Sequence, residues 1–372
     1  MIVAGEASGD LHGADLAAQI LARDPGCELF GIAGARMRAA GVHALARIED
    51  VAGLGLAELA PTIRRTLGAL RELKTALRRR ERPDLAILID FAEFNMRLAA
   101  IARRAGVPVL YYITPQVWAW RRGRIAKLIR RADRLAVVLP FEAELYASAG
   151  SRVTFVGHPL LDRVAPAQDR AATLKRHGLS AQARLLALLP GSRRGEIRYL
   201  LRPLVESARV LAADHGMVPV IALAPTLTPA QLRNEGRIDL DGIRIIEGDT
   251  YSIIAAADLT LTASGTATLE TTLLGCPMVV AYRMSPLTYA AARVLVRGVR
   301  FIAMPNILAG RQVVPELIQS QVSVRNLVRA AENLMVEPLR SETRAALLGL
   351  RSRLGEPGAA ARVAAIALEM MA

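Results

Sequence analysis

The stretch from Arg184 to Arg198 constrains the fold of this chain more than any other. Its first part, Leu185 to Leu189, is a short apolar run with the length of a buried strand. Pro190-Gly191-Ser192 ends the run in a tight turn, and a helical pattern begins at Arg194. A strand, a small-residue turn and a helix form the repeating unit of an α/β protein. Backbone N–H groups at the start of such a helix lack partners within the helix, so they can bind an anion.

Arg193 follows that turn and adds a planar, permanently charged guanidinium that suits phosphate oxygens. Gly191, Ser192 and Arg193 are therefore a candidate phosphate-binding loop. An ordinary strand-to-helix turn with a surface arginine explains the same residues equally well when this stretch is taken alone.

Short apolar runs followed by helical patterns recur along the chain. Their continuous apolar character indicates strands buried on both faces, as in parallel sheets with right-handed crossovers. We predict two Rossmann-like α/β domains, residues 1–162 and 163–344, with a polar linker at 163–183. The predicted strands are 2–4, 29–34, 84–91, 107–113, 134–140 and 153–156 in the first domain, and 185–189, 218–223, 243–246, 259–263 and 278–282 in the second.

The charge of the chain indicates an anionic partner. Its 372 residues carry a net charge of +14, and the pI is near 10.8. Nucleic acid is the least favoured partner, because aromatic residues make up only 4% of the chain and no Cys/His pattern resembles a zinc module. A phosphorylated substrate and an acidic membrane surface are the two other candidates.

The compartment is predicted from what the sequence contains. The two cysteines, Cys27 and Cys276, lie far apart in apolar sequence, which favours buried thiols in a reducing compartment. The first residues have neither the basic nor the long apolar region of a signal peptide, and no apolar run reaches the ~18 residues of a membrane span. We therefore expect a cytoplasmic protein whose membrane contact is peripheral.

A glycine loop follows the first predicted strand, with glycines at positions 5, 9 and 13. Glycine lets the backbone pass close to a ligand or a neighbouring strand, but this spacing differs from the dinucleotide fingerprint G-x-G-x-x-G. The loop carries Ser8, Asp10 and His12. Acidic side chains oppose a bound phosphate, so a sugar or another hydroxylated ligand fits the loop better.

Asp90 and Glu93 follow the clearest strand of the first domain, at the carboxyl edge where open α/β sheets bind ligands. Either carboxylate is a candidate general base. The alternative is that this segment, which ends at Asn95, only caps the next helix.

Residues 51–82 combine leucines at helical spacing with many basic residues. A basic amphipathic helix is typical of a membrane-surface segment, although a core-facing helix with a solvated basic face has the same pattern. The residues assigned to this candidate membrane patch are Leu56, Leu59, Ile63, Arg64, Arg65, Leu67 and Leu70.

Both tryptophans of the chain, Trp118 and Trp120, lie beside Arg121 in the loop after strand 107–113. One interpretation is a packed aromatic pair between two elements. The other is a surface contact or a wall for acyl chains of a ligand, and we assign the three residues to it.

A second small-residue loop, Ser264-Gly265-Thr266, joins a buried strand to a helix and again offers N–H groups to phosphate. Glu270 lies one helical turn beyond Thr266, where its carboxylate can accept both hydroxyls of a vicinal diol such as ribose. A plain helix cap with a solvated glutamate is the alternative. Two phosphate-type loops in one domain favour a nucleoside-diphosphate site, with a hydroxylated or lipidic acceptor in the first domain.

Seven motifs of the chain, taken in order, resemble the lipid-A-disaccharide synthase family. The resemblance covers nearly the whole chain, and its Trp-Ala-Trp-Arg and Ser-Gly-Thr-Ala motifs are specific. The motifs are Gly5-Glu-Ala-Ser-Gly-Asp10, Pro115-Gln-Val-Trp-Ala-Trp-Arg121, Leu139-Pro-Phe-Glu142, Phe155-Val-Gly-His-Pro159, Leu189-Pro-Gly-Ser-Arg193, Ser264-Gly-Thr-Ala267 and Pro305-Asn-Ile-Leu-Ala-Gly310.

The resemblance implies a GT-B fold, with two Rossmann-like domains that face a cleft and C-terminal helices, about 345–372, that pack on the first domain. It implies an inverting glycosyltransferase of lipid A biosynthesis. This hexosyltransferase joins UDP-2,3-diacylglucosamine to 2,3-diacylglucosamine 1-phosphate (lipid X) in a β-1,6 bond and releases UDP. The resemblance also implies a peripheral enzyme on the inner face of the inner membrane that needs no metal or other cofactor, and members of the family form homodimers.

The resemblance assigns roles to three residues: Arg193 neutralises the leaving diphosphate, Glu270 holds the ribose and Asn306 lines the donor site. The family usually reads Asp-x-Pro-Asp-Phe-Asn where this chain has Asp90-Phe-Ala-Glu93-Phe-Asn95. Glu93 keeps the carboxylate at the family's catalytic position but is one methylene longer, and an alanine replaces the rigid proline. Glu93 is the first choice as base, with Asp90 and His12 in reserve.

Two other interpretations use fewer of these features. A UDP-N-acetylglucosamine epimerase, or a GT-B transferase of a non-lipid sugar, would share the donor half but would not need the basic, apolar region at 51–82. A non-enzymatic nucleotide-binding protein at the membrane would not need carboxylates at positions 90 and 93.

Overall fold

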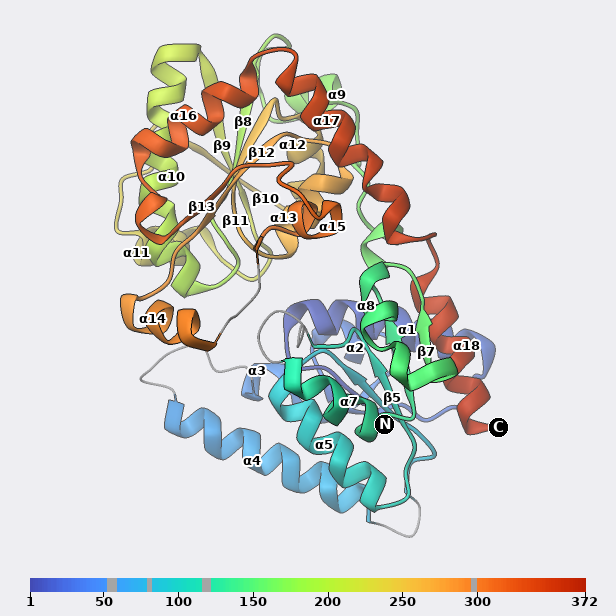
Figure 1. The fold of residues 1–372 in the computed structure, drawn as a ribbon. Helices are drawn as coiled ribbons and strands as arrows, with labels where there is room; N and C mark the ends of the chain where they lie inside the picture. Colours follow the sequence, from blue (N-terminus) through green and yellow to red (C-terminus); the bar gives the residue numbers. More distant parts are fainter. Residues whose placement is uncertain (52–58, 79–81, 116–121, 296–299) are drawn as a thin grey trace. The chain divides into compact units, whose positions relative to one another are not determined.

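The computed structural model describes residues 1–51, 59–78, 82–115, 122–295 and 300–372. They form two units, each built around its own parallel sheet (Figure 1). The first unit is Met1–Asp162 together with Leu354–Ala372, and the second is Arg163–Arg353. The chain therefore leaves the first unit after Asp162 and returns to it at Leu354.

The first unit contains a seven-stranded sheet in the order β3-β2-β1-β4-β5-β6-β7, and every neighbouring pair is parallel. This is a doubly wound order, in which the direction of strand addition reverses between β1 and β4. The strands are β1 (Ile2–Val3), β2 (Phe30–Ala33), β3 (His43–Arg47), β4 (Ala86–Ile89), β5 (Val109–Tyr112), β6 (Arg134–Val137) and β7 (Val153–Phe155). The helices are α1 (Ala7–Arg23), α2 (Ala35–Ala39), α3 (Ile48–Val51), α4 (Leu59–Ala76), α5 (Ala92–Arg104), α7 (Ile125–Arg131), α8 (Pro140–Leu145) and α18 (Ala359–Met371), with 3-10 turns η2 (Arg122–Arg124), η3 (Ala147–Arg152) and η4 (Pro159–Asp162).

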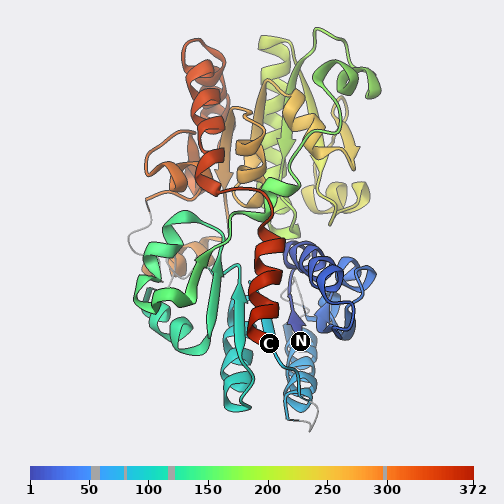
Figure 2. The ribbon, with the colours of Figure 1, turned by 90° about the vertical axis from the view of Figure 1, so that its right-hand side faces the viewer.

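The C-terminal helix α18 belongs to the first unit, where it packs against α1 (Figure 2). The returning segment begins at Leu354 rather than near residue 345. The helix before it, α17 (Leu339–Gly349), contacts α13 (Thr266–Leu273) and α16 (Val324–Met335) of the second unit, so residues 345–349 stay with that unit. The last 3-10 turn, η6 (Arg351–Leu354), forms the crossing.

The second unit contains a six-stranded parallel sheet in the order β10-β9-β8-β11-β12-β13, and its winding reverses between β8 and β11. The strands are β8 (Arg184–Leu189), β9 (Met217–Leu223), β10 (Arg244–Glu247), β11 (Leu259–Ala263), β12 (Met278–Tyr282) and β13 (Glu316–Ile318). The other helices are α9 (Arg170–Arg176), α10 (Arg194–His215), α11 (Pro229–Gly236), α12 (Thr250–Ala256), α13 (Thr266–Leu273), α14 (Pro286–Leu295), α15 (Met304–Ala309) and α16 (Val324–Met335), with the 3-10 turn η5 (Gln319–Gln321).

Strand β8 shows why a continuous apolar run forms a central strand. Successive side chains of a strand point to opposite faces of the sheet. Leu186 and Leu188 enter one core cluster, whereas Leu185, Ala187 and Leu189 enter another. Each buried leucine contributes about 1.5–3 kcal/mol relative to an exposed one. A polar residue anywhere in this run would therefore destabilise one core or the other.

The reversal of winding in each sheet brings the predicted loops together. In the first unit, β1 leads to Gly5 and its neighbour β4 leads to Asp90. In the second unit, β8 leads to Gly191 and its neighbour β11 leads to Ser264. Parallel strands end at the same edge of a sheet, and ligands of such sheets bind at this reversal point. The fold thus defines one candidate site region in each unit.

Candidate active site

Gly5 and Phe91 come together at the reversal point of the first sheet. A Cβ atom at position 5 would lie 2.1 Å from the Cγ of the Phe91 ring. Any larger residue would displace the ring, so this close approach requires glycine. Phe91 also stacks on Phe94, with the ring centroids 5.0 Å apart. These contacts fix the segment that carries the two candidate bases.

Asp90 and Phe91 both have left-handed backbone, with φ of 45° and 47°. Such conformations cost about 1–3 kcal/mol each in non-glycine residues and persist only where the surroundings impose them. The buried Asn95 amide donates to the carbonyl of Ile89 at 3.1 Å and to that of Asp90 at 3.0 Å. The buried Tyr111 hydroxyl donates to the same Asp90 carbonyl at 2.8 Å. Two buried side chains therefore hold a strained turn at the candidate site.

Glu93 lies in the first turn of α5, where the positive end of the helix dipole favours a carboxylate. Its two oxygens face the guanidinium of Arg124, whose Nη1 contacts Oε1 and whose Nη2 donates to Oε2 at 3.2 Å. The Glu93 side chain is 62% exposed, so an acceptor hydroxyl can reach it. The structure thus gives this carboxylate a defined orientation and access from solvent.

Asp10 has a structural partner that the sequence did not indicate. Helix α1 begins at Ala7, so the half-buried Ser8 and the buried Asp10 lie in its first turns rather than in an open loop. The two carboxylate oxygens of Asp10 accept the backbone N–H groups of Arg36 and Met37, each at 3.0 Å, at the start of α2. Both oxygens therefore help to fix the start of α2, and since each keeps a further lone pair, the contact of Asp10 with the acceptor stays a prediction.

His12 is buried, with only 6% of its surface exposed. Nearby lies His158, whose pKa is lowered to about 3 by burial and by His12. His158 is consequently neutral, and its Nδ1 accepts the backbone N–H of Leu160 at 3.2 Å. A base must come within hydrogen-bonding distance of its proton. Burial makes His12 a poorer candidate base than Glu93.

Some predicted residues lie outside the part of the chain that the structure describes. These are the acceptor-surface residues Trp118, Trp120 and Arg121 and the patch residue Leu56. Leu59 and Ile63 lie in α4, but their side chains are also outside the described part. In the described part of α4, Arg64, Arg65 and Leu67 are exposed and Leu70 is half-buried.

The first phosphate-type loop of the second unit contains an internal carboxylate. Glu196 in α10 accepts the backbone N–H of Ser192 at 2.8 Å and that of Arg193 at 3.3 Å through Oε2. Gly191 has a φ of 121°, and a Cβ there would lie 2.4 Å from the same oxygen. Glu196 thus occupies two of the N–H groups assigned to phosphate. The Arg193 side chain is 52% exposed, so an anion can reach it, and its Nη1 lies 4.0 Å from Oε1 of Glu196.

The second phosphate-type loop differs from the first. Ser264 and Gly265 follow β11, and α13 begins at Thr266 with no acidic residue in its first turn. The Ser264 hydroxyl donates to the carbonyl of Ile302 at 3.1 Å, which anchors the loop. The positive end of this helix therefore suits a phosphate better than that of α10.

Glu270 is held by a tyrosine from a different element. Its Oε1 accepts the hydroxyl of Tyr251 at 3.1 Å, and Tyr251 lies in α12, the helix that follows β10. Burial raises the pKa of Glu270, and the hydrogen bond from Tyr251 lowers it by a smaller amount. One oxygen is thus oriented by the protein, which leaves the carboxylate suited to accept a hydroxyl from a ligand.

Asn306 is fully buried, and its whole amide is used inside the protein. Nδ2 donates to the carbonyl of Val314 at 2.9 Å and to the Glu316 carboxylate at 2.7 Å, while Oδ1 accepts the N–H groups of Val313 and Val314 at 2.6 and 2.9 Å. An amide offers two donor hydrogens and two acceptor lone pairs, so none is left for a ligand. The expected donor contact of Asn306 is therefore corrected to a positioning role beside β13.

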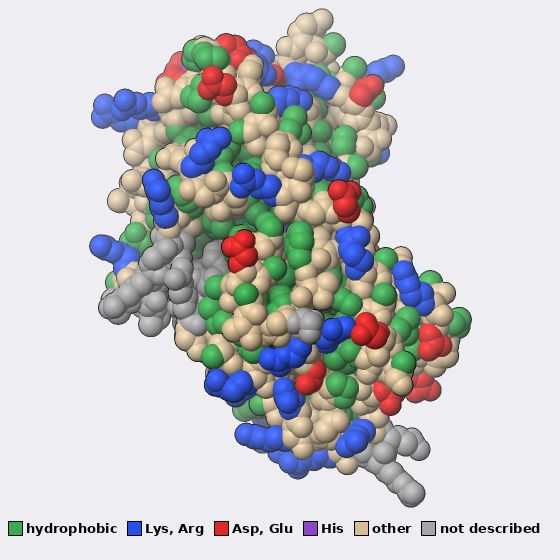
Figure 3. All heavy atoms as spheres, turned by 45° about the vertical axis from the view of Figure 1, so that its right-hand side comes forward, with side chains coloured by type: hydrophobic (Ala, Val, Ile, Leu, Met, Phe, Trp, Pro, Cys, Tyr) green, Lys and Arg blue, Asp and Glu red, His purple; other side chains and the backbone are tan. Residues whose placement is uncertain are grey.

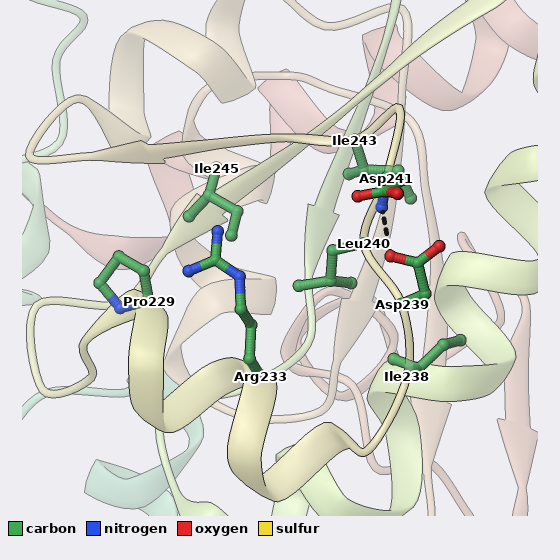
Figure 4. A pocket seen from close by; sticks show the side chains of 8 residues that line it. All are labelled: Pro229, Arg233, Ile238, Asp239, Leu240, Asp241, Ile243 and Ile245. Atoms are coloured by element: carbon green, nitrogen blue, oxygen red, sulfur yellow. Dashed lines mark hydrogen bonds between the residues drawn. The ribbon is translucent and has the colours of Figure 1, made fainter.

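A cavity of about 520 Å³ lies away from both reversal points (Figure 4). It opens between α11 and the amino end of β10, and Arg233 extends into it between Pro229 and Ile245. Ligands of doubly wound sheets bind at the carboxyl edge, not at the amino edge. None of the predicted site residues lines the cavity, so we assign it no part in the reaction.

The described residues contain no cluster of metal-binding side chains and no membrane-spanning helix. No group of three or more His, Cys, Asp or Glu side chains with the arrangement of a metal site occurs among them. None of the described helices is long and apolar enough to cross a membrane.

Two tandem doubly wound sheets, each with its own reversal point, define the GT-B fold, which glycosyltransferases and UDP-sugar epimerases share. Solved structures share this fold. The glycosyltransferase of kitacinnamycin matches with a TM-score of 0.65 at 17% identity, covering 99% of this chain and 98% of its own. MurG of Acinetobacter baumannii matches with a TM-score of 0.59 at 16% identity, covering 99% of each chain. UDP-GlcNAc 2-epimerase of Neisseria meningitidis, solved with UDP-GlcNAc bound, matches with a TM-score of 0.63 at 14% identity over 97% of each chain.

Sequence relatives identify the family within this class. The family model described as lipid-A-disaccharide synthetase matches residues 1–369. The lipid-A-disaccharide synthases of Syntrophus aciditrophicus and Geobacter metallireducens are each 44% identical, over 100% of this chain and 97% of theirs. The chain belongs to the lipid-A-disaccharide synthase family and is a glycosyltransferase of lipid A biosynthesis. The predictions of fold class, family and enzyme activity from the sequence are confirmed.

Proposed function

We propose that this enzyme transfers 2,3-diacylglucosamine from UDP-2,3-diacylglucosamine to the 6-hydroxyl of 2,3-diacylglucosamine 1-phosphate (lipid X). The product is a β-1,6-linked disaccharide, and UDP is released. The observation that carries the proposal is that the candidate UDP-binding groups and the candidate base lie in different units. The second unit holds Arg193 and Glu270 at its reversal point, and the first unit holds the exposed, oriented carboxylate of Glu93.

The reaction is a single displacement at the anomeric carbon. The acceptor 6-oxygen forms a bond to C1 as the bond from C1 to the β-phosphate oxygen breaks, and the configuration inverts from α to β. The hydroxyl proton passes to Glu93, and the electron pair of the broken bond leaves with UDP. A positioned base of this kind contributes roughly 10²- to 10⁴-fold to the rate.

The leaving diphosphate needs stabilisation but no proton. The Arg193 guanidinium and the start of α13 supply positive charge where negative charge develops on the diphosphate. Glu270 accepts a ribose hydroxyl, which fixes the nucleoside at a defined distance from the diphosphate. In this proposal the internal hydrogen bonds of Glu196 hold the first loop in shape, and the second loop binds the phosphate.

The proposal is tested by mixing the pure enzyme with UDP-2,3-diacylglucosamine and lipid X and measuring UDP and disaccharide. The variant Glu93→Gln should lose roughly 10²- to 10⁴-fold in kcat and bind UDP as tightly as the wild type. Glu369→Gln is the matched control, because Glu369 is also an exposed glutamate paired with an arginine, Arg134, at 2.9 Å in the same unit. If the wild-type enzyme forms neither product, the substrate assignment is wrong; if Glu93→Gln keeps nearly full rate, the base lies elsewhere.

Helix α4 supports a contact with an anionic membrane surface. Its described part buries Ala69, Leu73 and Ala76 against the protein, so this face belongs to the core. The opposite face exposes Arg64, Arg71 and Lys74, and Leu67 is 44% exposed, whereas Arg65 lies on the side of Ala69 and lines a pocket with it. Basic side chains near an anionic surface contribute about 1 kcal/mol each at moderate ionic strength. Figure 3 shows basic side chains spread over the face it draws, so charge alone does not single out one element; in α4 the exposed basic residues occur together with the exposed Leu67.

A further inference from the structure

Gln319 combines two unfavourable features in one residue. Its backbone is left-handed, with a φ of 53°, although it is not a glycine, asparagine or aspartate. Its side-chain nitrogen Nε2 is buried, and no described residue accepts a hydrogen bond from it. Buried donors in native proteins almost always have partners, and strained backbone concentrates at binding sites. The coincidence of the two at one position indicates a partner that arrives from outside the protein.

The amide of Gln319 is held in place at its other atom. Oε1 accepts the backbone N–H of Met284 at 3.3 Å. Gln319 directly follows β13 and Met284 lies just beyond β12, so the contact joins the carboxyl ends of two neighbouring strands. Because the oxygen is engaged, the two hydrogens of Nε2 are the part of the side chain that lacks a partner. A ligand at this edge must therefore supply an acceptor oxygen.

The strand order shows which part of a sugar nucleotide this acceptor belongs to. At the carboxyl edge, Tyr251 follows β10 at one end of the sheet and Gln319 follows β13 at the other. The loop Ser264–Thr266 lies between them, after β11. Tyr251 contacts Glu270, so the ribose group lies on the β10 side of the phosphate loop. The glycosyl group, on the opposite side of the diphosphate from the ribose, then extends towards β12 and β13.

Distances are consistent with this layout. Neighbouring strands lie about 4.8 Å apart, so the ends of β11 and β13 are separated by roughly 10 Å. That separation suits a group attached to the far phosphate of a diphosphate bound at the start of α13. It is too long for a second contact to the same phosphate.

We propose that Gln319 binds the glycosyl group of the donor, with its amide nitrogen donating to a hydroxyl or acyl-carbonyl oxygen of the sugar. The inference rests on the proposed donor site at Arg193 and Ser264–Thr266 and adds a residue that recognises the transferred group. Gln319 thereby distinguishes UDP carrying a sugar from UDP alone.

The test compares two ligands on each variant. The dissociation constants of UDP and of UDP-2,3-diacylglucosamine are measured by calorimetry for the wild type, Gln319→Leu and Gln319→Glu. The glutamate keeps the oxygen that accepts from Met284 and removes the donor; the leucine removes both. In both variants the ratio of sugar-nucleotide to UDP affinity should fall about 3- to 10-fold, the worth of one hydrogen bond. Taking the ratio cancels any effect that the new charge of the glutamate has on the diphosphate.

Gln321→Leu is the matched control. Gln321 lies in the same 3-10 turn, is exposed, and uses its Oε1 to accept the N–H of Ile318 at 3.1 Å. Its loss should leave the affinity ratio unchanged. An unchanged ratio in both Gln319 variants overturns the inference, even where the wild type binds both ligands and makes disaccharide. A wild type that binds neither ligand overturns the donor site itself, so the two failures are distinguishable.

Discussion

Arg124 and Glu93 form a two-pronged ion pair between elements that are 31 residues apart in the sequence. Both terminal nitrogens of the guanidinium face the two carboxylate oxygens, a geometry that favours one orientation of the carboxylate. Glu93 is one methylene longer than the aspartate expected at this position. The arginine therefore restricts a side chain that would otherwise sample more rotamers.

The first prediction concerns this pair. Arg124→Ala should lower kcat by about 10-fold or more, because a base that is misplaced by ~1 Å loses much of its effect. The affinity for UDP should not change, since Arg124 belongs to the first unit. Steady-state kinetics with both substrates shows whether kcat falls while the affinity for UDP stays the same. Arg134→Ala, which removes the partner of Glu369, is the control. A faster Arg124→Ala enzyme would show that the arginine restrains the base instead of orienting it.

The second prediction concerns Tyr251, which donates to Glu270 at 3.1 Å. Tyr251→Phe should weaken UDP binding about 3- to 10-fold, because the carboxylate loses the hydrogen bond that orients it. The same variant should bind 2′,3′-dideoxy-UDP as the wild type does, since that ligand has no diol for Glu270 to accept. Equal losses for the two nucleotides would contradict a role in ribose recognition.

The third prediction follows from the pKa of Glu270, which burial raises. A carboxylate whose pKa is higher in the folded chain than in the unfolded chain destabilises the fold when it is ionised. This penalty is fully present above the folded pKa and disappears as the pH falls to the unfolded value. Glu270→Gln should therefore be more stable than the wild type at neutral pH, and the difference should shrink on acidification. Thermal unfolding from pH 7 down to about pH 4, which spans the ordinary glutamate pKa, measures this.

UDP affinity should show the opposite dependence on pH. The ionised form of Glu270 accepts the ribose hydroxyl, so wild-type affinity should fall as the pH drops through the raised pKa. Glu270→Gln should show a smaller fall over the same range. An identical pH profile in the two proteins would mean that Glu270 does not contact the nucleoside.

The fourth prediction compares two adjacent tyrosines of β5. Tyr111 donates to the strained carbonyl of Asp90 at 2.8 Å, whereas the buried hydroxyl of Tyr112 has no hydrogen-bond partner among the described residues. Tyr111→Phe should destabilise the protein by about 1 kcal/mol and lower kcat, because the turn that carries the base loosens. Tyr112→Phe should leave kcat unchanged and leave stability unchanged or higher. Denaturant unfolding and turnover are measured together, and equal effects of the two variants would rule out a special role for Tyr111.

The fifth prediction concerns membrane contact through α4. Vesicles containing anionic lipid should bind the enzyme at low salt and release it as salt is added, because screening weakens attraction to a charged surface. Arg64→Glu with Arg71→Glu, both on the exposed face of α4, should reduce binding strongly. Arg202→Glu with Arg209→Glu, on the exposed side of α10 in the second unit, changes the net charge equally and should have a smaller effect. Equal loss in both double variants would assign binding to net charge alone.

The sequence by itself determined most of the architecture, but it did not indicate the edge strands β3 and β13, which are not fully buried and so lack a continuous apolar run. The buried strands appear as local apolar runs, because a strand of a parallel sheet is covered on both faces and has no polar side. The loops Gly191–Arg193 and Ser264–Thr266 could also be predicted from the sequence. Small residues between an apolar run and a helical pattern are recognised without any knowledge of distant contacts. The family motifs added the activity, and the relatives confirm it.

Tertiary structure decided what each polar group does. Asp10 accepts hydrogen bonds from backbone N–H groups of α2, and the side-chain amide of Asn306 is fully hydrogen-bonded beside β13. Glu196 accepts hydrogen bonds from N–H groups that the sequence assigned to phosphate. Of these three contacts, only the one made by Glu196 has a local signal, the three-residue spacing of a capping box. The partners of Glu93, Glu270 and Gln319 come from other elements, at separations of 31, 19 and 35 residues. A hydrogen bond depends on distances of a few tenths of an ångström between such elements, and only the packed chain sets those distances.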